Sequence, residues 1–96
     1  MLKLYHESNL VGRIPDFCAN GFEMHGLVEL TEKAADYKPV LDYWASDDKD
    51  PAVEPPFPHA LFENWFVEDE EGAKRNIGIP DIYTNEGRLE ILWRYF

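Results

Sequence analysis

The chain has 96 residues, the size of a single domain with one hydrophobic core. Apolar residues make up 45% of it and aromatic residues 15%, which excludes a disordered acidic tail, and a single cysteine, Cys18, excludes an internal disulfide. Nine Lys and Arg against nineteen Asp and Glu give a net charge of −10, which disfavours direct binding of DNA, RNA or anionic lipid and favours a basic partner protein.

The start of the chain predicts a cytoplasmic location. Met1 is followed directly by a strand-like run, so the basic start and apolar core of a signal peptide are missing. No stretch has the apolar length needed to cross a bilayer, and no basic amphipathic helix suggests a membrane surface. We therefore expect a reduced, cytoplasmic protein that does not contact membranes. Its acidity then serves either solubility alone or the binding of a basic partner.

Residues 1–30 form a strand-rich half and predict three strands. An alternating run, a polar interruption and a second extended run predict a first hairpin. Proline lacks the amide hydrogen that a strand ladder needs, so we expect Pro15 to take the chain out of regular pairing. Asn20-Gly21 is a strong signal for a tight turn, and residues 22–30 predict the third strand after it.

Residues 31–45 predict a helix with one apolar face. Thr31 suits the N-cap position, and Glu32 suits the positive end of the helix dipole. Pro39 lies inside the helical pattern and removes a backbone hydrogen bond, so we expect a kink or a break near Lys38. The apolar residues recur at spacings of three and four: Ala34, Tyr37, Leu41 and Trp44.

Residues 46–58 predict an acidic, proline-rich linker. A charge run is followed by four closely spaced prolines, a composition that disfavours regular structure. A segment of this kind can dock in an aromatic groove of a partner, but a linker that crosses between two halves is the preferred interpretation. Phe57, flanked by prolines, is the aromatic residue that we most expect to be exposed.

Residues 59–96 form the second strand-rich half, which begins with an aromatic strand that leads into an acidic turn. Its clearest element is a hairpin at the end of the chain, joined by Thr84-Asn85-Glu86-Gly87, where Asn and Gly tolerate the positive φ of a tight turn. We expect the last strand to run to Phe96 and to be tied into a sheet, because exposed aromatic residues are unfavourable in water. One face of this strand carries Leu89, Ile91, Trp93 and Tyr95.

Two Ile-Pro-Asp segments, at residues 14–16 and 79–81, occupy comparable places in the two halves. A duplicated unit is one interpretation, but we prefer two independent proline kinks in two extended stretches. The elements together predict an α+β fold, with a mainly antiparallel sheet of five or six strands and one helix, kinked or broken at its proline, packed on one face. Residues 1–96 form a single domain in this prediction.

The histidines and the cysteine are the first candidates for a catalytic or metal site. His6, His25 and His59 lie far apart, and none of them stands in a metal-binding spacing, so we expect no metal and no cofactor. Cys18 is a candidate nucleophile only if a histidine lies beside it, and a buried, inert thiol is the preferred interpretation. An enzyme or ligand-binding domain that uses His6, His25 or Cys18 therefore remains an alternative.

The leading hypothesis is a non-enzymatic acidic binding protein, of the inhibitor, immunity or nucleic-acid-mimic type, which engages a basic partner surface. A second hypothesis is an assembly or scaffold module that self-associates or pairs with another chain through its C-terminal strand, so a homo-oligomer is open. For the leading hypothesis, the candidate partner-binding residues are Asp47, Asp48, Asp50, Phe57, Glu68, Asp69, Glu70 and Glu71.

Overall fold

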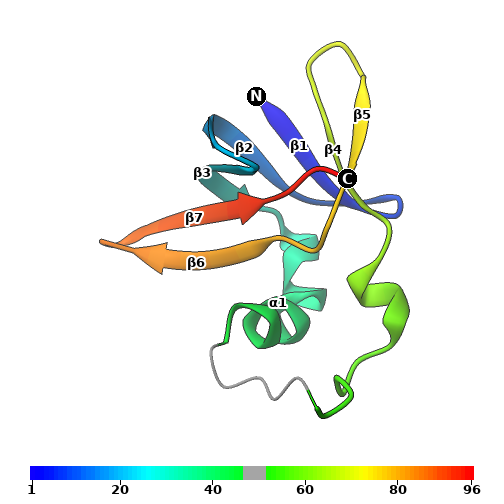
Figure 1. Ribbon diagram of the computed structural model, residues 1–96. Coiled ribbons are helices and arrows are strands. Elements are labelled where there is room, and N and C mark those ends of the chain that lie inside the picture. The colour runs from blue at the N-terminus through cyan, green and yellow to red at the C-terminus, as the bar shows by residue number, and fades with distance from the viewer. Residues whose placement is uncertain (47–51) are drawn as a thin grey trace.

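The computed structural model describes residues 1–46 and 52–96, and its main feature is one antiparallel sheet of seven strands (Figure 1). The elements in chain order are β1 (Leu2–His6), β2 (Asn9–Asn20), β3 (Glu23–Leu30), the 3-10 turn η1 (Glu32–Asp36), α1 (Lys38–Ala45), the 3-10 turn η2 (His59–Phe62), β4 (Trp65–Glu68), β5 (Lys74–Ile77), β6 (Asp81–Asn85) and β7 (Arg88–Trp93). The strands are arranged in the order β5-β4-β1-β2-β3-β7-β6. The α+β prediction is confirmed.

The sheet has seven strands, where the sequence predicted five or six. The additional strand arises because the stretch that follows the acidic turn is not one strand but two, β5 and β6, separated by Gly78, Ile79 and Pro80. Pro80 has no amide hydrogen for a ladder and is buried at this corner. A single strand through this point would have left a gap in its hydrogen bonding.

Strands β1, β2 and β3 form a meander whose turns match the predicted ones. Leu2 pairs with Ile14 in the first hairpin, and Asn20 pairs with Glu23 across the Asn-Gly turn of the second. The kink expected at Pro15 is a local irregularity inside β2, because the register with β3 shifts between Arg13 and Asp16 and the strand then resumes. A proline on an exposed bulge avoids the lost hydrogen bond of a regular ladder.

The predicted helix consists of two pieces, as the proline indicated. The 3-10 turn η1 ends before Tyr37, and α1 begins at Lys38, which places Pro39 in the first turn, where its missing amide hydrogen has no intrahelical partner to lose. The prediction that Thr31 caps the helix with its side chain is wrong. Its hydroxyl donates instead to the backbone carbonyls of Leu10 and Val11, at 2.6 and 3.1 Å, and so ties the start of η1 to β2.

The second half of the chain adds strands to both sides of the meander. Strand β4 pairs with β1 and carries β5 at the outer edge, whereas β7 pairs with β3 and carries β6. The two halves therefore differ in strand order, which argues against the duplication. The sheet also curls, because a bridge joins Ile77 to Tyr95, and the amide of Phe96 donates to the carbonyl of Asn76 at 3.2 Å. The end of the described chain accordingly lies beside β5 (Figure 1).

The core lies inside this curl and receives one face of the helical segment. The predicted alternation of β7 is confirmed, since Ile91 and Trp93 are almost fully buried. The end of the chain differs from the prediction, because β7 stops at Trp93 and the ring of Phe96 is 90% exposed. Sixteen hydrophobic residues form the core: Leu2, Leu4, Val11, Ile14, Val28, Ala34, Tyr37, Val40, Leu41, Trp65, Val67, Ile77, Ile79, Ile82, Ile91 and Trp93.

Candidate functional site

His6 is a buried structural residue and not an accessible catalytic group. Its side chain is 2% exposed, and its Nε2 lies 2.7 Å from the carbonyl oxygen of Ala60, which can only accept a hydrogen bond. Nε2 therefore carries the proton, and Nδ1 accepts from the hydroxyl of Tyr37 at 2.8 Å. Asn9 Nδ2 donates in turn to the Tyr37 oxygen at 2.8 Å, and the imidazole packs against Trp65. This chain of hydrogen bonds satisfies both ring nitrogens.

Cys18 and His25, in contrast, lie next to each other on β2 and β3. They are a directly opposed pair in the ladder, with Cys18 Sγ 3.3 Å from His25 Nε2 and 3.8 Å from His25 Nδ1. Cys18 is exposed and His25 is half-buried. The prediction of a buried cysteine is therefore wrong, and the condition for a candidate nucleophile, a histidine beside the thiol, is met.

The close approach of β2 to β3 beside this pair depends on Gly26. A Cβ atom at Gly26 would lie 2.1 Å from the backbone oxygen of Asp16 and 2.8 Å from the Cα of Phe17, too close for any side chain. The bulge between Arg13 and Asp16 brings the backbone of β2 to this point, where Phe17 opposes Gly26. The sequence thus fixes the local geometry with one proline and one glycine.

The surface next to the pair is a shallow hollow of about 210 Å³. Strand β7 forms one side of it with Arg88 and Glu90. The carboxylate of Glu90 faces β6, where it accepts hydrogen bonds from the hydroxyl of Tyr83 at 3.5 Å and from Asn85 Nδ2 at 3.2 Å. Burial, and then the negative charge of Glu90, raises the pKa of the Tyr83 phenol above its ordinary value. Within the described residues no carboxylate hydrogen-bonds to the imidazole of His25, so the arrangement is a pair and not a triad.

The acidic turn at residues 68–71 connects β4 and β5 and has a well-defined backbone. Asp69 Oδ1 accepts hydrogen bonds from the backbone amides of Glu71 and Ala73, both at 2.9 Å, so Asp69 stabilises the turn itself. The carboxylate of Glu70 pairs with the amino group of Met1 at 2.9 Å. Glu68 is half-buried, whereas Glu71 is exposed and its carboxylate has no partner among the residues that the structure describes. Of the four predicted residues, Glu71 is the most available to a partner.

The other predicted site residues are placed as follows. Asp47, Asp48 and Asp50 lie outside the described residues. Phe57 is half-buried and not exposed as predicted, because its ring packs edge-to-face against the rings of Tyr43 and Phe62 at 5.5 and 6.4 Å between centroids.

No metal site is visible in residues 1–46 and 52–96. His59 is exposed, and its only close charged neighbour there is Glu54, 3.5 Å from His59 Nε2. No group of three or more His, Cys, Asp or Glu side chains in these residues is arranged to hold a metal ion.

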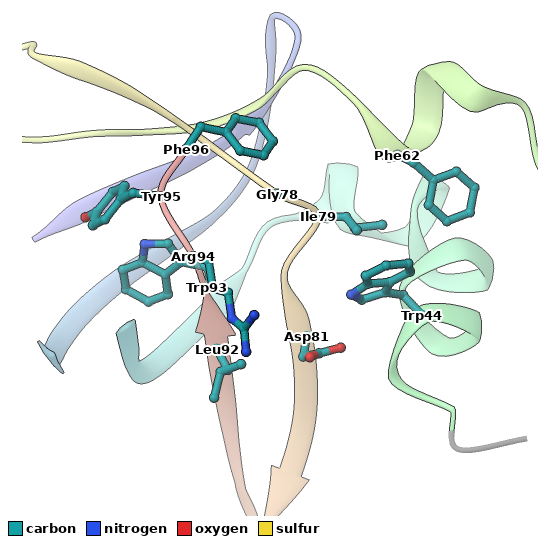
Figure 2. A pocket seen from close by; sticks show the side chains of 10 residues that line it. All are labelled: Trp44, Phe62, Gly78, Ile79, Asp81, Leu92, Trp93, Arg94, Tyr95 and Phe96. Carbon is teal, nitrogen blue, oxygen red and sulfur yellow. The ribbon is translucent and has the colours of Figure 1, made fainter. Parts of the chain in front are cut away.

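A larger hollow, of about 510 Å³, was not predicted from the sequence (Figure 2). Trp44 and Phe62 stand on one side of it, and the segment from Leu92 to Phe96 forms the other. Figure 2 also shows the carboxylate of Asp81 pointing toward the indole nitrogen of Trp44. The hollow forms where the break between β5 and β6 meets the end of β7, so it depends on pairings between distant parts of the chain.

In the part of the chain that the structure describes, no helix has the length and apolarity that a membrane crossing requires. Comparison of the chain with protein-family models, with curated proteins and with solved structures finds no match in any of the three. The function proposed below accordingly rests on the charges and geometry of this chain.

Proposed function

We propose that this protein is a non-enzymatic acidic binding protein that engages a basic surface on a partner protein, as an inhibitor, an immunity protein or a nucleic-acid mimic does. The observation that carries the proposal is the net charge of −10 together with the position of the acidic side chains at the protein surface. None of the Asp and Glu side chains in residues 1–46 and 52–96 is buried, so their charge acts on the surroundings of the protein. A surface field of this kind attracts basic partners and accelerates their association.

The acidic turn at residues 68–71 is the surface that we assign to first contact. Asp69 holds its backbone in place through two hydrogen bonds, so the turn loses little conformational freedom on binding. Glu71 presents to solvent a carboxylate that has no partner in residues 1–46 and 52–96, and Glu70 pairs with the amino group of Met1. Exposed carboxylates of this type contribute mainly to the association rate and to its salt dependence.

The arrangement of the sheet bears on the alternative of an assembly module. Strand β7 is paired along one side with β3 and along the other with β6, so it offers no free edge to a further strand. The edge strands are β5 and β6, but the outer side of β5 is partly occupied by the end of the chain through the bridge between Ile77 and Tyr95, so a partner strand would add more readily at β6. The hypothesis of pairing through the C-terminal strand therefore has less support than the acidic surface.

Affinity capture with the purified protein from a lysate of its source organism, at low and at high salt, tests the proposal. We expect a basic protein to be retained at about 50 mM salt and released at about 500 mM, because screening lengths shorten over this range. The contact surface is tested with Glu71→Lys and a matched control, Glu63→Lys, an exposed residue just beyond the other end of β4 that changes the net charge equally.

With the captured partner purified, Glu71→Lys should weaken binding at low salt by about tenfold or less, as for a single rim charge, and Glu63→Lys should weaken it clearly less. Equal effects of the two variants would reject the acidic turn as the contact surface. Retention of every partner regardless of salt, or of no basic protein at all, would reject the proposed function itself.

A further inference from the structure

We propose that Cys18 and His25 form a reactive thiol–imidazole site at which a low-molecular-weight disulfide adds reversibly to the protein. The site is independent of the acidic binding function, because it lies on β2 and β3, whereas the acidic turn joins β4 and β5. Its chemistry is thiol–disulfide exchange, and its product is a mixed disulfide at Cys18.

The thiol of Cys18, a nucleophile, is in contact with the imidazole of His25, a base. A thiol in water is ionised to only a few per cent at neutral pH, so a neighbouring proton acceptor accelerates its attack. His25 Nε2 lies 3.3 Å from Cys18 Sγ, within the hydrogen-bond range for sulfur, and this distance is set by direct opposition in the ladder. The pairing of the two strands therefore places the imidazole next to the sulfur.

The sulfur of Cys18 is accessible to small molecules in solution. Cys18 is exposed, so a disulfide can reach its sulfur without a conformational change, and the hollow of about 210 Å³ beside it has room for a small reactant. Arg88 lines this hollow, and its guanidinium has no ion-pair partner among the described residues. A guanidinium at this place favours a disulfide that carries carboxylates, because arginine binds carboxylates well.

The backbone around the pair is held in a fixed position. The bulge between Arg13 and Asp16 and the close contact that only a glycine at position 26 permits set the position of β2 against β3 beside Cys18. With any residue other than glycine at position 26, the backbones of β2 and β3 would have to lie farther apart here. The register places the following charged and titratable residues on the same face of the sheet as the pair: Asp16 on β2, Glu23 on β3, Arg88 and Glu90 on β7, Arg94 just after β7, and Asp81 and Tyr83 on β6. Glu23 and Arg94 pair with each other, and the Glu90 carboxylate bonds to Tyr83 and Asn85.

The exchange step is balanced as follows. His25 accepts the thiol proton while Cys18 Sγ attacks one sulfur of the incoming disulfide, so a new sulfur–sulfur bond forms and the old one breaks. The bonding electron pair leaves with the second sulfur, which takes the proton from the imidazolium and departs as a thiol. Cys18 is oxidised to a mixed disulfide and the reactant disulfide is reduced, and a second thiol reverses the reaction.

The test uses 5,5′-dithiobis(2-nitrobenzoic acid), a disulfide with two carboxylates, and follows release of its coloured thiolate from the full chain between pH 6 and pH 10. We expect His25→Gln to react about tenfold more slowly than the wild type at pH 7 and at an equal rate near pH 10, where the thiol ionises without help. His59→Gln, a change of an exposed histidine outside the sheet, should leave the rate unchanged.

A second pair of measurements keeps the proposal falsifiable if His25→Gln folds poorly. The wild-type rate alone should fall by less than about fivefold between pH 7 and pH 6, whereas an unassisted thiol loses about tenfold over this unit, because both pH values lie well below the ordinary thiol pKa of about 8.5. Arg88→Gln should slow the reaction with the dianionic disulfide but not with the neutral 2,2′-dithiodipyridine. A wild-type rate that follows the unassisted thiol, or equal rates for wild type and His25→Gln at pH 7, would overturn the proposal.

Discussion

The buried hydroxyl of Tyr37 should contribute about 2 kcal/mol to the free energy of unfolding, although Tyr37→Phe removes only one oxygen atom. This oxygen accepts a hydrogen bond from Asn9 and donates one to His6 Nδ1, both at 2.8 Å. Without it, the buried Nδ1 loses its hydrogen-bond donor, because the neighbouring Glu7 carboxylate oxygen, 3.7 Å away, accepts and does not donate. The loss is about 1–3 kcal/mol, while the part-buried Asn9 can turn toward water at a smaller cost. A domain of this size then melts about 10 °C lower.

Urea unfolding of wild type, Tyr37→Phe and the control Tyr5→Phe measures this effect. Tyr5 also packs against an aromatic ring, Phe66, but its hydroxyl has no hydrogen-bond partner within the described residues, so we expect a loss below about 0.5 kcal/mol. His6→Phe alone leaves the proton of the Tyr37 hydroxyl without its acceptor, although the oxygen still accepts from Asn9. The double variant should therefore lose about 1 kcal/mol less than the sum of the single losses. Equal losses for the two Tyr→Phe variants, or strict additivity, would refute the network.

Three further predictions concern the sheet. Gly26→Ala should lower the free energy of unfolding by about 3 kcal/mol, because the added methyl would lie 2.1 Å from the carbonyl oxygen of Asp16. Gly78→Ala should lower it by less than about 0.5 kcal/mol, because its added methyl has no neighbour closer than 4.0 Å. Equal losses for the two variants would contradict this prediction. Trp65→Phe should cost about 1 kcal/mol more than Trp93→Phe in urea unfolding. Both indoles are buried, but Trp65 Nε1 donates a hydrogen bond to the carbonyl of Leu61, whereas Trp93 Nε1 has no acceptor among the described residues. The reverse order would contradict this prediction. The raised pKa of Tyr83 means that the folded protein retains the phenol proton to higher pH than the unfolded chain, so this group's stabilisation, complete below about pH 10, is lost as the pH rises through the folded-state pKa. Absorbance titration of wild type and Tyr83→Phe checks the shift, and a difference curve centred on the ordinary tyrosine value would contradict it.

The hairpins were predictable because their turns carry local chemical signals. Gly21 and Gly87 both adopt positive φ, at 67° and 78°, as the Asn-containing turns indicated. The contact between Cys18 and His25 also follows from such a signal. Once Asn20 pairs with Glu23 across the turn, the residues two positions farther along each strand must oppose each other. The turn signal at Asn20-Gly21 alone therefore places Cys18 opposite His25.

The strand order and the curl of the sheet were not predictable in the same way. The pairing of β1 with β4 and of β3 with β7 joins segments that share no turn, so no short stretch of sequence specifies it. The exposed ring of Phe96 and the hollow beside Trp44 are consequences of these pairings. Local signals also failed where a tertiary contact replaced them, as when Thr31 bonded to the carbonyls of β2 in place of its helix.

The same pairings have a consequence for the route by which the chain folds. Leu27 pairs with Glu90 and Tyr5 with Phe66, so each of these ladders closes a loop of about 60 residues, whereas the four hairpins close within a few residues. Closing a long loop costs conformational entropy before the contacts that offset this cost can form. The meander and the β6–β7 hairpin therefore form early, and the pairing of β3 with β7, which joins them, limits the folding rate. Folding should therefore take milliseconds to seconds, and substitutions at the seam between β3 and β7 should slow it more than equally destabilising substitutions on α1.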